Sequence, residues 1–244
     1  MKKISFWMCI PIAFLIVVII GIITVYVIAR QEQRVCSLVS TQENCTLKTP
    51  FISVTAEYPP GSYIFAETMC LAAFLVLVTA VLRFTILQTM TKNQFKILNT
   101  ITLALLCLVC VGMTILGNVQ LSVNSLLHNI GAYAAFGVGL IACWTNSVLT
   151  FHANIQMEGR IIGIFRTFLS FTATIAFILY MVLQGMASAK AQWALVILVS
   201  VYIASLAIEL RFSNFRIHFW DTRNSSGNTN KAGAQVILAA NLVS

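Results

Sequence analysis

The sequence predicts an all-α, polytopic membrane protein built as a bundle of six transmembrane helices. Of its 244 residues, 59% are hydrophobic and only 9% are charged, whereas soluble domains have about 25% charged residues. The mean hydropathy is +0.90. Apolar runs such as FLIVVII and AAFLVLV are continuous rather than alternating, which favours helices over the strands of a membrane barrel.

Six apolar stretches are long enough to cross about 30 Å of hydrocarbon as helices. We place the spans at residues 6–29, 63–87, 98–119, 130–151, 167–188 and 193–212. The first run exceeds the ~7–15 residues of a signal-peptide core, so we expect it to stay as a span, with cleavage after Ala29 as the alternative. Residues 1–212 then form the membrane domain. Residues 213–244 are rich in Asn, Ser and Gly and are expected to be a disordered cytosolic tail.

The basic residues predict that both termini are cytosolic. With the N-terminus inside, eleven of the fifteen Lys and Arg residues lie on the cytosolic side or at the helix ends there, as the positive-inside rule requires. The net charge of +8 is therefore interpreted as basic flanks against anionic lipid. Membrane lipids are expected partners, and nucleic acid is not.

Two features of the first outer loop agree with this orientation. Asn44 begins a glycosylation sequon, which is used only on the lumenal side. Cys36 and Cys45 share the same loop, and we expect them to form a disulfide because that compartment is oxidising. The alternative, two free thiols in a cytosolic loop, contradicts the charge count. A second sequon at Asn224 falls in the tail and should stay bare.

No residues converge as a catalytic, metal or cofactor site requires. His128 and His152 lie at opposite ends of the predicted fourth span, about 36 Å apart along a helix, so they cannot share a metal or a haem. Cys107 and Cys110 lie in the middle of a span, where cysteine behaves as a small apolar residue. The motifs of hydrolases, zinc proteases and phosphate loops are absent from the sequence. We therefore expect a protein that is not an enzyme and has no cofactor.

Three ionisable residues fall inside the predicted spans: Glu67, Arg83 and Glu209. Such residues are costly in lipid and are candidates for function. Each lies close to a predicted boundary, where a long side chain can reach water. A position at the interface is the favoured interpretation, and a role inside the bundle is the alternative.

Small residues recur every four positions in the fourth span, at Gly131, Ala135 and Gly139. This spacing places them on one helix face and allows close helix packing. A contact within the bundle is favoured over a dimer seam. Homo-oligomers are possible but not indicated.

Several stretches, in order, resemble the damage-regulated autophagy modulator (DRAM) family. TPFISVTAEYPPGSYIF at 49–65 is similar to that family's P-[YF]-I-S…P-P…I-F segment before the second span, and GNVQ at 117–120 begins a stretch similar to its G-N-F-Q…H-x-x-G pattern. MEGRIIGIFR, AQWALV and AIELRF are most similar to the transmembrane-protein-150 group, which includes tentonin. The residues that match the family pattern on the outer face are Ile52, Ser53, Pro59, Pro60, Phe65, Gly117, Asn118, Gln120, His128 and Gly131.

The resemblance implies a non-enzymatic membrane regulator or scaffold. Family members are linked to autophagy, to phosphoinositide kinase machinery and to mechanically activated cation currents, so a cation channel or channel modulator is the alternative. It also implies plasma or endosome–lysosome and autophagosome membranes, reached through the secretory pathway. Protein partners are expected on the cytosolic loops, including the basic MEGRIIGIFR at 157–166, and on the tail.

The two outer segments suggest a cap over the bundle. Pro59 and Pro60 restrict the backbone around them, so the segment at 49–65 is expected to be stiff and to pack over the helix ends. We expect Asn118, Gln120 and His128 to pair with its peptide groups, because such groups need partners near lipid.

Overall fold

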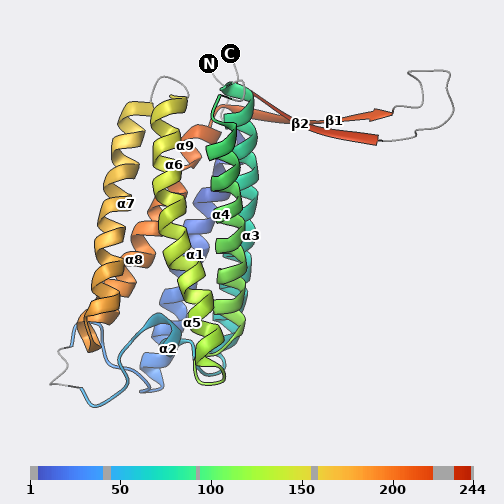
Figure 1. Cartoon of the computed structure of the whole chain (residues 1–244). Coiled ribbons are helices and arrows are strands. Elements are labelled where there is room, and N and C mark those ends of the chain that lie inside the picture. The colour runs from blue at the N-terminus through green and yellow to red at the C-terminus, as the bar shows by residue number, and fades with distance from the viewer. Residues whose placement is uncertain (1–4, 41–44, 92–93, 155–158, 222–233, 243–244) are drawn as a thin grey trace.

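Six long helices form the protein in a computed structural model, which describes residues 5–40, 45–91, 94–154, 159–221 and 234–242 (Figure 1). All six are long and apolar enough to cross a membrane. In order, the helical elements are the 3-10 turn Phe6–Met8, α1 (Cys9–Gln31), α2 (Ile52–Thr55), α3 (Gly61–Met90), α4 (Lys96–Asn118), α5 (Ser125–Tyr133), the π-helical turn Ala134–Val138, α6 (Gly139–Ala153), α7 (Gly159–Val182), α8 (Gly185–Ser205) and α9 (Ala207–Leu210).

The long helices pack as a closed ring. Each one contacts the next in the order α1, α3, α4, α5 with α6, α7 and α8, and α8 returns to α1. Large apolar side chains remain exposed on the outer surface, among them Ile20, Phe74 and Phe168, where the bilayer can solvate them. The buried faces carry small residues such as Ala72 and Ala142, polar residues such as Asn146, and larger apolar residues such as Phe14 and Leu195.

The fifth and sixth helices begin eight residues earlier than the sequence analysis placed them, at 159 and 185 rather than 167 and 193. The turn between them falls at Leu183 and Gln184, because Gly185 adopts a positive φ of 58° that only glycine reaches without strain. The sequence analysis placed the turn near Lys190, because a charged residue favours a loop. In the structure Lys190 lies within α8. The shift moves Arg166 from a helix end to a buried position seven residues after the first residue of α7.

The two ends of the membrane domain meet at one end of the bundle. The backbone N–H of Ser5 donates to the carbonyl of Arg211 at 2.7 Å. The tail leaves from this end (Figure 1). In place of the expected disorder, β1 (Ser213–Asp221) and β2 (Ala234–Leu242) pair as an antiparallel hairpin. Apolar and polar residues alternate in FRIHF at 215–219, a pattern typical of a strand.

The predicted disulfide in the first outer loop is confirmed. Cys36 and Cys45 are joined by an S–S bond of 2.00 Å at the opposite end of the bundle from the termini. The sequon residue Asn44 lies outside the described residues.

Candidate functional site

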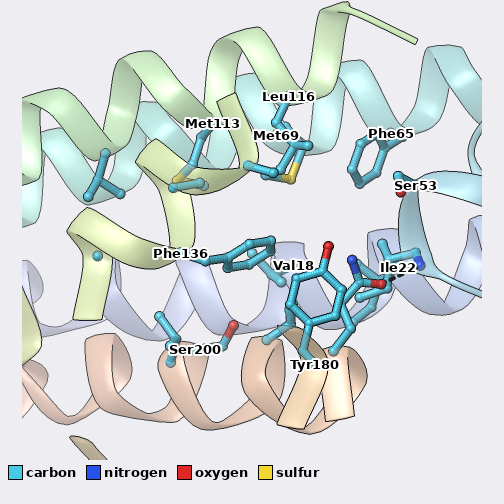
Figure 2. Close-up of a pocket in the computed structure, with 18 of the residues that line it drawn as sticks. Val18, Ile22, Ser53, Phe65, Met69, Met113, Leu116, Phe136, Tyr180 and Ser200 are labelled. Atoms are coloured by element: carbon cyan, nitrogen blue, oxygen red, sulfur yellow. Dashed lines mark hydrogen bonds between the residues drawn. The ribbon is translucent and has the colours of Figure 1, made fainter. Parts of the chain in front are cut away.

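A cavity of about 280 Å³ lies on the axis of the ring and extends from the segment at α2 as far as Phe14 of α1 and Ile203 of α8. Its walls come from α1, α3, α4, α5, α6 and α8, and the end of α7 contributes Tyr180. Figure 2 shows Phe136 and Tyr180 projecting into the space between Val18 on one side and Met69 and Met113 on the other.

The segment Phe51–Val54 forms the outer end of the cavity, as a lid. α8 holds this lid through two hydrogen bonds. The N–H of Ile52 donates to Oε1 of Gln192 at 2.8 Å, and Nε1 of Trp193 donates to the carbonyl of Pro50 at 2.9 Å. Phe51 also makes an edge contact with Tyr180, with 6.3 Å between ring centroids.

The disulfide loop supports the lid from outside, around Tyr58. The guanidinium of Arg34 and the ammonium of Lys48 lie 4.9 Å and 5.3 Å from the Tyr58 ring centroid, which is within cation–π range. Lys48 also pairs with Glu57 at 2.8 Å, and this hydrogen bond raises the pKa of Lys48 above its usual value. Charged contacts thus join the residues flanking the disulfide to Glu57 and Tyr58, which lie between the lid and α3.

The expected cap is present, but its hydrogen-bond partners differ from those the sequence analysis named. Asn118 donates to the carbonyl of Thr114 within its own helix, and His128 Nδ1 lies 2.5 Å from the carbonyl of Val119. The carbonyl of Gln120 accepts from the N–H of Asn124 at 3.2 Å, closing a turn. These residues order the second outer loop, whereas Gln192 and Trp193 bind the lid.

The remaining residues of the family pattern also lie at this end. Ser53 and the buried Phe65 line the cavity, while Pro59 and Pro60 are exposed at the turn before α3. Gly117 packs so closely on α3 that an added Cβ would lie 2.6 Å from Cβ of Met69.

The small residues of the fourth span face α4. A Cβ added at Gly131 would lie 2.9 Å from the backbone nitrogen of Leu116, and one added at Gly112 would lie 2.7 Å from that of Ala135. Gly139 lies farther along the same face and lines the cavity. Between them, the π-helical turn Ala134–Val138 rotates the helix and carries Phe136. Such turns occur frequently at functional sites.

A buried ionic cluster lies beyond the other end of the cavity. Glu209 accepts from Nε of Arg83 at 2.8 Å and from Nη1 of Arg166. These three side chains are at most 4% exposed. Asn146 and Thr150 of α6 accept further hydrogen bonds from Arg83 at 2.5 Å and 3.0 Å. Two guanidinium groups share one carboxylate, so the cluster carries one positive charge in excess.

A layer of hydroxyl groups separates the cavity from the cluster. The hydroxyl of Tyr202 donates to the carbonyl of Cys143, a residue that lines the cavity, at 2.7 Å. The Ser147 hydroxyl lies 3.0 Å from that of Tyr202 and 3.3 Å from that of Ser170. The hydroxyl layer adjoins the cluster, because Ser147 follows Asn146 directly in α6. Along the axis, the order is therefore lid, cavity, hydroxyl layer and ionic cluster.

The favoured interface interpretation is wrong for two of the three ionisable residues. Arg83 and Glu209 lie inside the bundle and bind each other, whereas Glu67 is exposed on the surface of α3. Arg166 was assigned to a cytosolic helix end, and MEGRIIGIFR to an exposed loop. In the structure Gly159–Arg166 belongs to α7, Arg166 is 0% exposed, and residues 157–158 lie outside the described part. One signal in the sequence could have indicated the cluster: Arg83, Arg166 and Glu209 are residues of opposite charge near the same end of three different spans, where they can pair.

Within the described part of the chain, no group of three or more His, Cys, Asp or Glu side chains is placed to hold a metal ion.

Replacing Gln192 with leucine is expected to loosen the lid. The N–H of Ile52 is buried and would lose its acceptor, which costs about 1–3 kcal/mol of unfolding free energy. Thermal unfolding of the purified protein in detergent measures this loss. The matched control is Gln184→Leu at the exposed start of the same helix. Equal unfolding temperatures for both variants would contradict the role of Gln192.

Comparison with known proteins identifies the family. The sequence model of the Frag1/DRAM/Sfk1/Cwh43P N-terminal domain matches residues 6–212. The chain is 29% identical to the modulator of macroautophagy TMEM150B of Xenopus tropicalis over 88% of this chain and 86% of that one. It is 30% identical to transmembrane protein 150A of Xenopus laevis over 71% and 69%. With the mouse DNA damage-regulated autophagy modulator protein 1 it shares 30% identity over 42% and 44%. No solved structure shows significant similarity. The match across residues 6–212 shows that the chain belongs to the Frag1/DRAM/Sfk1 family.

Proposed function

We propose that the chain is a multi-pass membrane modulator of macroautophagy that acts through protein partners rather than by catalysis. One observation carries the proposal: the similarity to a protein named as a modulator of macroautophagy extends over 88% of this chain. The other relatives named above are likewise called modulators or plain membrane proteins rather than enzymes. A rigid ring with ordered surfaces at both ends fits a protein that presents binding sites at a membrane.

The test is autophagic flux in cells that express the protein. Deleting its gene should change the rate at which a tandem-fluorescent autophagy reporter reaches acidic lysosomes. Wild-type protein should restore the rate. Unchanged flux after both deletion and overexpression would overturn the proposal.

The proposal places both termini in the cytosol and the disulfide loop in the lumen of the secretory pathway. The excess of basic residues toward the termini supports this orientation, and the disulfide at the opposite end agrees with an oxidising lumen. From there the protein would reach endosome–lysosome or plasma membranes. Cytosolic partners, among them phosphoinositide kinase machinery, would bind the end that carries the hairpin.

Glycosylation tests this orientation. Asn44→Gln should increase the gel mobility of the protein expressed in mammalian cells, because it removes the lumenal glycan. Treatment with a peptide N-glycosidase should do the same to the wild type. Asn224→Gln, in the tail sequon, is the matched control and should change nothing. A shift with Asn224→Gln alone would reverse the orientation.

A mechanically activated cation channel is the second candidate, favoured by the cavity on the axis of the ring. Two features oppose an axial pore. The lid covers one end of the cavity, and the cluster at the other end carries an excess positive charge that repels cations. A modulator of another channel is compatible with both features.

We therefore expect purified protein in liposomes to show no cation current when the patch is stretched. A known mechanosensitive channel in the same lipid serves as the positive control. A stretch-activated current that changes its cation selectivity in Arg83→Gln would contradict this expectation and favour an axial pore.

A further inference from the structure

The cavity has the form of a site for an apolar molecule. It encloses about 280 Å³, roughly nine times the ~30 Å³ that one water occupies in the liquid. Water needs about two to four polar partners to stay in a cavity. The deeper walls offer few, because apart from Cys143, Ser200 and the hydroxyl of Tyr180 they are made of apolar side chains such as Val18, Val109 and Met113. Water is therefore a poor occupant of the deeper part.

The polar groups gather at the lid end. Ser53, His128, Asn129 and Gln192 line the cavity there, and Asn129 is also exposed. The cavity thus reaches the surface beside the lid, at a point where a polar group can remain outside. An occupant with one polar end and one apolar end fits this distribution.

The length of the apolar part of the cavity matches the hydrocarbon thickness of one bilayer leaflet. Along α8 the lining extends from Gln192 to Ile203, which is about 16 Å at ~1.5 Å per residue. Half of the ~30 Å hydrocarbon core is about the same length, and this is the depth that one lipid acyl chain fills. Met69 and Met113 lie on the same wall of the cavity (Figure 2), and their flexible side chains can adapt to a flexible acyl chain.

We propose that this cavity binds one acyl chain of a membrane phospholipid, with the polar part of the lipid beside Ser53 and Asn129. The lid then contacts the bound lipid directly through Phe51 and Ile52. The lid both lines the cavity and forms part of the outer face, where Gln192 and Trp193 hold it. A bound lipid would therefore change the conformation of the outer face. This inference stands independently of the role in autophagy.

Two glycines on the same helix provide a variant and its matched control. Gly139 lines the cavity, and a Cβ added there meets only Cγ2 of Val109, another lining residue, at 3.8 Å, so the leucine of Gly139→Leu has room to fill the space. A Cβ added at Gly137 meets only Cζ of Phe177, at 3.9 Å, and Gly137 does not line the cavity. Both variants add the same side chain, two residues apart.

The experiment uses the full chain in lipid nanodiscs that contain a phosphatidylcholine with a diazirine midway along one acyl chain. After illumination, peptides are analysed by mass spectrometry. Adducts are expected on cavity residues such as Met113 and Phe136. Their yield is compared with that on Ile175 and Ile178, which are exposed on α7 and report ordinary contact with bulk lipid.

The ratio should fall about tenfold in Gly139→Leu, which corresponds to about 1.4 kcal/mol of lost binding, and stay unchanged in Gly137→Leu. If Gly139→Leu does not fold, Val196→Phe fills the same cavity from α8. Adducts on the exposed residues alone, or an equal ratio in the filled variants, would overturn the proposal. Labelling of the cavity by a photoactivatable sterol, with none by the phospholipid, would overturn it as well.

Discussion

Replacing Glu209 with glutamine is expected to cost about 3–5 kcal/mol of unfolding free energy, the range observed when one partner of a buried ion pair is removed. The carboxylate is the only anion that Arg83 and Arg166 contact among the described residues. Glutamine keeps the shape of the side chain but removes its charge. Two guanidinium groups would then stay buried beside each other without a counter-charge. Thermal unfolding in detergent measures the loss.

Glu67→Gln is the matched control, because it makes the same chemical change at an exposed position on α3. We expect it to leave the unfolding temperature nearly unchanged. Arg166→Gln removes the excess positive charge of the cluster, so it should cost less than Glu209→Gln. The double variant restores the wild-type net charge and should recover part of the loss. Equal losses in Glu209→Gln and Glu67→Gln would mean that the cluster does not stabilise the bundle.

Six continuous apolar stretches of sufficient length were enough to predict six helices, because lipid allows few other ways to pair backbone groups. The disulfide followed from two cysteines in one short loop. The outer segment at 49–65 was expected to cap the bundle, and Phe51–Val54 within it lines the end of the cavity, whereas residues 61–65 begin α3. Its partners were not assigned correctly, because the residues expected to bind it satisfy their own loop first. Gln192 lies 140 residues from Ile52 in the chain, and no local pattern connects them.

The ionic cluster was missed for a related reason. Burial of a charge depends on where a span begins, and the fifth span was placed eight residues too far along. That shift left Arg166 at a helix end, where an arginine reaches water and needs no partner. Without Arg166, Arg83 and Glu209 looked like two separate interface residues. The turn before Gly185 fixes where the fifth span ends, and so where it begins. Placing this turn correctly is therefore what would have shown that Arg166 is buried.

Replacing Gly131 with valine is expected to separate α4 from α5, at a cost of about 3 kcal/mol, the upper end of the usual range for overpacking. An added Cβ would lie 2.9 Å from the backbone nitrogen of Leu116 and 3.0 Å from the carbonyl oxygen of Gly112. Neither atom can move without moving its helix. A flexible side chain could turn aside, but two backbones in contact cannot.

Gly137→Val is the control for this prediction, six residues farther along the same continuous helix. Its added Cβ meets only the end of the Phe177 ring, at 3.9 Å, so it carries the same change in helix propensity without the clash. The difference between the two unfolding free energies isolates the close approach of α4 and α5. If Gly131→Val and Gly137→Val unfold at the same temperature, the helices do not depend on this contact. If only Gly131→Val is unstable, the role of Gly131 is to let α4 and α5 pack closely. The π-helical turn that follows it then has a separate role, which is to place Phe136 in the cavity.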